Sequence, residues 1–155
     1  MNDSIHIEEA AASEVPMDLL LQADPSKKKV EGYLSQSRSF VAKMDGRLVG
    51  ACVVKQVSTD AYELMNISVA PEHQKKGIGR ELLQHVINSV RESKVKRLEL
   101  GTGTFGYQLA FYQREGFRVD AIEKDFFLIN YEEPIFEDGI QLKDMLRLVI
   151  KFDVD

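Results

Sequence analysis

The spacing of apolar residues predicts a series of strands interrupted by helices. The clearest helix covers residues 77–91, where an apolar residue recurs every four positions and polar residues occupy the opposite face. Asp45-Gly46, between two apolar runs, is a strong hairpin signal. Strands are predicted where apolar residues alternate or run together, at 5–7, 39–44, 48–57, 62–69, 97–100, 117–122 and 145–152.

Three shorter helices complete the pattern. Ser13 is a candidate cap for the apolar segment 15–23, and Asp24-Pro25 offers a cap and a first-turn proline for a helix over 26–36. A helix over 107–115 ends at Gly116, a position that often adopts a left-handed turn. Residues 131–139 are expected to form an acidic loop. Hairpin strands mixed with crossover helices indicate one α+β domain over residues 1–155.

Composition restricts the class of protein. The 155 residues suit one domain, and 44% hydrophobic with 29% charged residues is typical of a globular chain. A net charge of −5 argues against a nucleic-acid partner, because such proteins carry basic patches. The chain has a single cysteine, Cys52, and shows neither a signal-peptide pattern nor a long apolar run. We therefore expect a cytoplasmic protein with no membrane segment. The three histidines have no metal-ligand spacing, so we expect no metal.

The segment 69–80 carries the most specific chemistry. A strand ends at Val69, a short loop holds Lys75 and Lys76, and glycines 77 and 79 open the long helix. Unpaired N–H groups and the positive end of the helix dipole make such a helix start an anion site, and glycine lets a phosphate approach the backbone. The segment lacks the Gly-Lys-Ser/Thr ending of a Walker A loop. A basic loop before a surface helix is the alternative, but a glycine at position 79 costs a helix about 1 kcal/mol, which a ligand approaching closely would offset.

The run Gln74-Lys75-Lys76-Gly77-Ile78-Gly79 resembles the pyrophosphate-binding signature Gln/Arg-x-x-Gly-x-Gly/Ala of the Gcn5-related N-acetyltransferase (GNAT) superfamily. It follows a strand ending in Val-Ala-Pro, as that signature usually does. The resemblance implies a mixed, mostly antiparallel central sheet of about seven strands flanked by about four helices, with acetyl-CoA as co-substrate. The implied acetyl-CoA-binding residues are Ile67, Ser68, Val69, Gln74, Lys75, Lys76, Gly77, Ile78, Gly79, Arg80 and Tyr112.

The same resemblance implies catalytic roles. The Val69 N–H matches the group that polarises the thioester carbonyl, a contact typically worth about 2.7–4 kcal/mol of barrier. Tyr112, in a segment similar to the family's second landmark, matches the acid that protonates the departing CoA thiolate; packing in the core is the alternative reading. The family often has an asparagine where this chain has Phe105, which leaves Thr102, Thr104 and Gln108 as substitutes.

The acceptor would be a primary amine of a small molecule or peptide, whose ammonium form has a pKa near 10.4 and must lose a proton. Glu63, on the strand leading to the acetyl site, is the candidate base, directly or through water, and an exposed strand glutamate is the alternative. Asn66 is a candidate for orienting water or the acceptor. The acidic, aromatic loop 131–138 would border the acceptor pocket and attract a cation. By family habit, a homodimer is possible.

Two other functions remain open. A non-catalytic acyl-CoA-binding or sensing domain would keep the anion site without turnover. A nucleotide-binding domain would use Gly101-Thr102-Gly103-Thr104-Phe105-Gly106, which has the form Gly-x-Gly-x-x-Gly. The helix after that run is too short for a dinucleotide fold, so it is better explained as a glycine-rich loop that lets two strands diverge.

Overall fold

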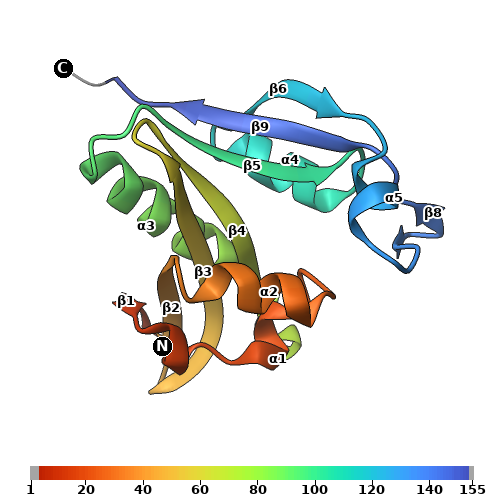
Figure 1. The fold of residues 1–155 in the computed structure, drawn as a ribbon. Helices are drawn as coiled ribbons and strands as arrows, with labels where there is room; N and C mark the ends of the chain where they lie inside the picture. Colours follow the sequence, from red (N-terminus) through yellow and green to blue (C-terminus); the bar gives the residue numbers. More distant parts are fainter. Residues whose placement is uncertain (1–3, 154–155) are drawn as a thin grey trace.

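A seven-stranded sheet organises the chain in the computed structural model, which describes residues 4–153 (Figure 1). The strands are β1 (Ile5–Ala10), β2 (Arg38–Met44), β3 (Arg47–Ser58), β4 (Ala61–Val69), β5 (Arg97–Gly103), β6 (Arg118–Glu123), β7 (Phe136–Glu137), β8 (Ile140–Gln141) and β9 (Met145–Lys151). The helices are α1 (Met17–Leu20), α2 (Lys27–Leu34), α3 (Ile78–Glu92), α4 (Tyr107–Arg114) and α5 (Phe126–Asn130), with 3-10 turns at Ala12–Glu14 and Pro71–His73.

The sheet has the strand order β1-β2-β3-β4-β5-β9-β6. Every neighbouring pair is antiparallel except β4 and β5, which are parallel and joined by the crossover helix α3. The predicted α+β fold with a mixed, mostly antiparallel sheet is therefore confirmed. None of the helices in the described part of the chain is long and apolar enough to cross a membrane.

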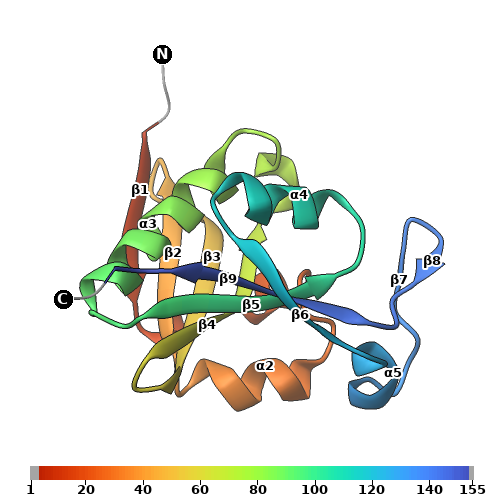
Figure 2. The same cartoon turned by 90° about the horizontal axis from the view of Figure 1, so that it is seen from above.

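Helices cover both faces of the sheet (Figure 2). On one face, the apolar stripe of α3, which includes Leu82, Leu83 and Val86, packs in a core cluster with the sheet and with Tyr112 of α4. On the other face, α1 and α2 bury Leu20 and Val30 against β2 and β3. Because both faces are buried, the middle of β2 (residues 40–42) and of β3 (residues 48–54) is continuously apolar rather than apolar at every second position.

The central feature of the sheet is the divergence of β4 from β5. Within residues 4–153, the two strands pair only over Ala61–Glu63 and Arg97–Glu99, and beyond that point they separate visibly in Figure 1. The pairing of β4 with β3 also shifts by one residue, which leaves Met65 as the extra residue of a β-bulge. Beyond the bulge, Ile67 and Val69 pack toward the core on the α3 face.

Asn66 links β4 to the helices on the opposite face. Its side-chain amide donates to the carbonyl of Leu20 (2.9 Å) and to the hydroxyl of Tyr33 (3.0 Å), and its Oδ1 accepts from the Ser68 hydroxyl (2.9 Å). Both amide hydrogens are used, so Asn66 has a structural role here. These contacts give no support to the expectation that Asn66 orients water or the acceptor.

Two predicted helix caps are wrong. Ser13 lies in the first 3-10 turn, and α1 follows Pro16, which has no side-chain cap. The cap of α2 is Ser26, whose Oγ accepts the N–H of Lys29. Asp24 instead accepts the N–H of Ser26, two residues along, as short polar side chains do in turns.

The C-terminal third of the chain differs most from the sequence prediction. Residues 126–130 form α5, which was not predicted, and the acidic loop 131–139 contains β7, which pairs with β8 directly after the loop. Gly101 and Gly103 lie inside β5 rather than in a loop. Gly106 is the cap of α4 at a φ of 101°, and α4 has only eight residues.

Asn66→Ala should lower the free energy of unfolding by about 2–3 kcal/mol, because it leaves the buried carbonyl of Leu20 and the hydroxyl of Tyr33 without a donor. Urea denaturation measures this loss. Asn88→Ala, at an exposed position of α3, is the matched control and should change stability by less than about 0.5 kcal/mol. Equal effects of the two substitutions would show that the buried network does not stabilise the fold.

Candidate active site

The loop before α3 presents backbone N–H groups to solvent. Lys75 and Gly77 both have left-handed backbone conformations, with φ of 64° and 83°. Gly77 caps α3 without a side-chain hydrogen bond, and the first helical bond runs from the N–H of Glu81 to the carbonyl of Gly77. The N–H groups of the three residues between them therefore have no partner in the helix and point outward at its positive end. This is the geometry of an anion site.

A cavity of about 530 Å³ lies beside this loop. Gly79 faces it from α3, where an added Cβ would come within 3.6 Å of Val69 and 3.8 Å of Phe111. The side chain of Gln74 donates to the carbonyl of Val69 (3.0 Å), which holds the loop against the end of β4. The lining residues are Ile67, Ser68, Val69, Gln74, Lys75, Gly77, Ile78, Gly79, Arg80, Tyr107, Gln108, Phe111 and Tyr112.

Two N–H groups of β4 face the gap between the diverging strands. The N–H of Ala70 donates to the carbonyl of Val49 on β3 (2.8 Å). Since alternate residues of a strand direct their N–H groups to the same side, Ser68 also faces β3. Ile67 and Val69 therefore face away from β3, toward the gap that β5 leaves open beyond Glu63.

A second cavity of about 720 Å³ opens on the other side of this gap. Its walls come from the segment before α2, from β4 and β5, and from the region of α5 and the β7–β8 hairpin. Three carboxylates line it, those of Asp24, Glu63 and Glu137. The aromatic lining residues are Tyr33, Tyr107, Tyr112, Phe126, Phe127, Tyr131 and Phe136.

One hydrogen bond joins opposite walls of this second cavity. The hydroxyl of Tyr131 donates to Asp24 Oδ1 (3.2 Å) across 107 residues of sequence. The ring of Tyr131 stacks on Phe127 and lies under the ammonium of Lys29, 5.1 Å from the ring centre. Residues 24 and 131 carry no recognisable motif, so the sequence alone gave no signal for this contact.

The two cavities meet at four residues, which line both: Ile67, Tyr107, Gln108 and Tyr112. The ring of Tyr112 is packed in the core against Phe111 and Phe117. No hydrogen bond of its hydroxyl occurs within residues 4–153, and Tyr112 lines both cavities. Burial, with smaller contributions from Cys52 and Tyr107, raises the pKa of Tyr112 above its ordinary value. The phenol therefore carries its proton at neutral pH.

The structure brings most of the predicted site residues together. Every predicted acetyl-CoA-binding residue lines the first cavity except Lys76, which is exposed. Glu63 lines the second cavity, and Phe105 lines neither. Gln108, a predicted substitute for the family's asparagine, lies at the junction. The sequence analysis missed Tyr107 and Phe111, whose neighbouring positions on α4 give no motif.

The apparent dinucleotide motif has a structural explanation. The glycines at 101 and 103 are strand residues, and a Cβ at either position would meet the side chain of Met145 or Leu142 within 3.0 Å. Packing against these side chains, rather than a phosphate, therefore accounts for the two glycines. Within residues 4–153, no group of three or more His, Cys, Asp or Glu side chains could hold a metal ion.

Comparison with known proteins supports the class that this architecture indicates. The family model for the acetyltransferase (GNAT) domain matches residues 35–119. "Uncharacterized N-acetyltransferase YvbK" of Bacillus subtilis is 42% identical over 134 residues, which are 86% of each chain. The chain therefore belongs to the GNAT acetyltransferase family, and it is an N-acetyltransferase of the acyltransferase class.

Two solved structures resemble the whole chain. The "IAA acetyltransferase" of Bacillus cereus is 39% identical with a TM-score of 0.91, covering 96% of this chain and 100% of its own. A GNAT family acetyltransferase from Elizabethkingia anophelis, solved with acetyl-CoA bound, is 39% identical with a TM-score of 0.92 and coverages of 97% and 100%. The expected cytoplasmic location and homodimer stay predictions.

Stability should fall at high pH, with Tyr33 as a measurable contributor. Burial and the nearby Asp24 carboxylate raise the pKa of Tyr33 to about 12, although its hydrogen bond with Asn66 opposes the shift. A tyrosine whose pKa is higher in the folded than in the unfolded state stabilises the protein as long as it is protonated. The contribution is fully present below the unfolded-state pKa of about 10, and it is lost as the pH rises through 12, where the folded-state tyrosine ionises.

Wild-type protein should therefore lose roughly 2 kcal/mol more stability than Tyr33→Phe between pH 10 and pH 12. Urea denaturation across this range measures the two slopes. Tyr107→Phe is the control, because its side chain is 72% exposed, and it should retain the wild-type slope. A Tyr33→Phe slope equal to the wild-type slope would contradict this assignment.

Proposed function

We propose that this N-acetyltransferase moves an acetyl group from acetyl-CoA directly to a primary amine of a small molecule or peptide. The observation that carries the proposal is the meeting of two cavities through the gap between β4 and β5, at Ile67 and Tyr112. One cavity begins at an anion site and suits a phosphate-bearing thioester. The other has an acidic and aromatic lining and suits an amine.

The first cavity fits the chemistry of CoA. The pyrophosphate would bind the N–H groups at the start of α3, where Lys75 and Arg80 add positive charge. The pantetheine arm would extend along β4, because the outward N–H groups of Ile67 and Val69 can pair with an added extended chain. A similar structure with acetyl-CoA bound supports this assignment.

The acetyl carbonyl would accept a hydrogen bond from β4. The family resemblance implies the Val69 N–H, and the cavity geometry favours the neighbouring outward N–H, that of Ile67, because Ile67 alone of the two lines both cavities. We therefore assign the carbonyl contact to Ile67 and a pantetheine contact to Val69. A preorganised backbone donor at this point stabilises the negative charge that develops on the carbonyl oxygen during attack.

Tyr112 would supply the proton for the departing thiolate. Tyr112 lines both cavities, and its hydroxyl is neutral at neutral pH and has no hydrogen-bond partner within residues 4–153. The packing of its ring against Phe111 and Phe117 fixes the direction of the hydroxyl. The core role and the acid role, posed above as alternatives, are thus compatible in one side chain.

Glu63 would accept the proton of the amine through water. It lies four positions before Ile67 on the strand, about 13 Å at roughly 3.3 Å per position, which is too far for direct contact. The carboxylates of Asp24 and Glu137 line the same cavity and favour a cationic acceptor, and the aromatic walls suit an apolar or aromatic portion of it. The proposed acceptor class is therefore a cationic amine with an apolar body.

Tyr112→Phe tests the proposal against a binding domain without turnover. Acetyl transfer from acetyl-CoA would be assayed on spermidine, kanamycin, tyramine and a peptide with N-terminal alanine. We expect wild-type turnover with at least one of them, and a loss of about 10- to 100-fold in kcat for Tyr112→Phe with little change in CoA affinity. Tight CoA binding by the wild type without transfer to any amine would favour the sensing domain.

Gly79→Trp serves as the binding control in the same experiment. An indole at position 79 would fill the cavity next to Val69 and Phe111 and should abolish CoA binding in calorimetry. Glu81→Trp, at an exposed position of the same helix, should bind CoA as the wild type does. Equal CoA affinity of the two tryptophan variants would overturn the placement of CoA in this cavity.

A further inference from the structure

Two carboxylates face each other at the point where β4 and β5 separate. Glu63 and Glu99 are Cα partners in the last paired position of these parallel strands. Their side chains lie on the same face of the sheet and are only 24% and 19% exposed. Like charges directly opposite one another destabilise a sheet, so this pair needs a counter-charge.

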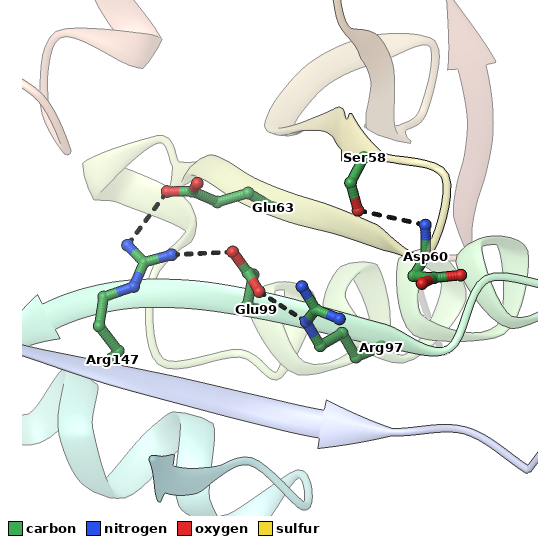
Figure 3. Close-up of polar contacts among 6 residues, drawn as sticks. All are labelled: Ser58, Asp60, Glu63, Arg97, Glu99 and Arg147. Atoms are coloured by element: carbon green, nitrogen blue, oxygen red, sulfur yellow. Dashed lines mark hydrogen bonds and ion pairs between the residues drawn. The ribbon is translucent and has the colours of Figure 1, made fainter. Parts of the chain in front are cut away.

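Arg147 of β9 supplies that charge (Figure 3). Its Nη1 donates to Glu63 Oε2 (3.3 Å) and its Nη2 donates to Glu99 Oε1 (3.2 Å), with the arginine side chain 17% exposed. Burial works against the charge of Arg147, but the carboxylates of Glu63, Glu99 and Glu123 outweigh it and raise the pKa of Arg147. One guanidinium therefore bridges β4 and β5 at their last paired position, just before they separate.

The two carboxylates are used differently. Glu99 has both oxygens occupied, because Oε2 accepts from the Nε of Arg97 (2.9 Å) while Oε1 accepts from Arg147. Glu63 has only Oε2 occupied, and its Oε1 makes no hydrogen bond within residues 4–153. Glu63 also lines the second cavity, where the acceptor is proposed to bind, whereas Glu99 does not. Glu99 thus anchors the arginine, and Glu63 retains one oxygen for a ligand or water.

Gly101 provides the space for this arrangement. It is the Cα partner of Arg147 on β5. A Cβ at position 101 would lie 3.0 Å from Nη1 of Arg147 and closer still to the end of the Met145 side chain. Both contacts are with the ends of flexible side chains, so an alanine would displace the guanidinium without disrupting the backbone.

We propose that Arg147 is a positioning residue for acetyl transfer: anchored by Glu99 and given room by Gly101, it balances the charge of the two facing carboxylates and orients that of Glu63 at the second cavity, the proposed acceptor cavity. This inference rests on the proposed role of Glu63 as the base. On β3, Lys55 is the Cα partner of Glu63, and the carboxylates of Asp24 and Glu137 line the same cavity. Arg97 pairs with Glu99, and Glu123 acts on Arg147.

Arg147→Gln removes the bridging charge and leaves two facing carboxylates that favour a shared proton. At saturating acetyl-CoA, we expect kcat to fall about 10- to 100-fold and the acidic limb of its pH profile to move up by about one pH unit, with CoA affinity unchanged. Arg147→Lys keeps a charge but cannot bridge both carboxylates as a fork does, so it should recover only part of the rate.

A second substitution separates this role from a loss of stability. In the double variant Arg147→Gln/Glu99→Gln, Glu63 no longer faces a second carboxylate. The acidic limb of the kcat profile should therefore return toward its wild-type position, although the double variant gains no stabilising contact. Gly101→Ala should shift the profile in the same direction as Arg147→Gln, with a smaller loss of rate. Arg38→Gln, which breaks a comparable ion pair with Glu9 at the far side of the sheet, should leave the profile unchanged.

The effect of Arg147 on Glu63 can also be measured by NMR without an acceptor amine. In protein labelled with ¹³C at glutamate carboxyls, the Glu63 signal should begin to titrate at higher pH in Arg147→Gln than in the wild type, and Glu99→Gln should reverse this. An unmoved Glu63 signal and an unmoved pH limb would overturn the role of Arg147. Absence of transfer to every amine in the panel, with the Glu63 signal moving as expected, would instead count against the proposed function.

Discussion

The site depends on the loss of pairing between β4 and β5 after Glu63 and Glu99. In a continuous sheet, the outward N–H groups of Ile67 and Val69 would bind the next strand and have nothing left for a ligand. Here the strands part, so a half-buried strand edge is exposed inside the molecule rather than at its rim. A free edge of this kind is normally a liability, because it invites pairing with another chain. An extended ligand arm bound between the strands satisfies it.

Other features of the chain follow from this gap. The bulge at Met65 allows β4 to direct Ile67 and Val69 to the α3 face while Asn66 remains bound to the helices on the other face. The left-handed turn at Gly77 starts α3 beside the end of β4, so its free N–H groups lie at one end of the gap. Tyr112 lies at the middle of the gap between β4 and β5, and Arg147 lies at its closed end, where the two strands still pair. Arg147 is thus a link between sheet construction and the proposed chemistry.

The sequence predicted much of this because several features are local. The period of α3, the Asp45-Gly46 hairpin and the loop with Gly77 before α3 each depend on residues close together in the chain, and each is present in the structure. Contacts between distant residues left no such signal. The Asp24–Tyr131 hydrogen bond and the Arg147 bridge join residues 107 and 84 positions apart. The glycines in β5 were attributed to a loop because the side chains that pack over them, Met145 of β9 and Leu142 just before that strand, lie about 40 positions further along the chain.

Residue-resolved amide hydrogen exchange, with and without saturating CoA, tests the central claim most directly. If the gap binds the extended arm of CoA, the N–H groups of Ile67 and Val69 should exchange rapidly in the free protein and become protected in the complex. The N–H of Ser68, which faces β3, should be protected in both states. Unchanged exchange at Ile67 and Val69, under conditions where calorimetry shows CoA bound, would contradict the account.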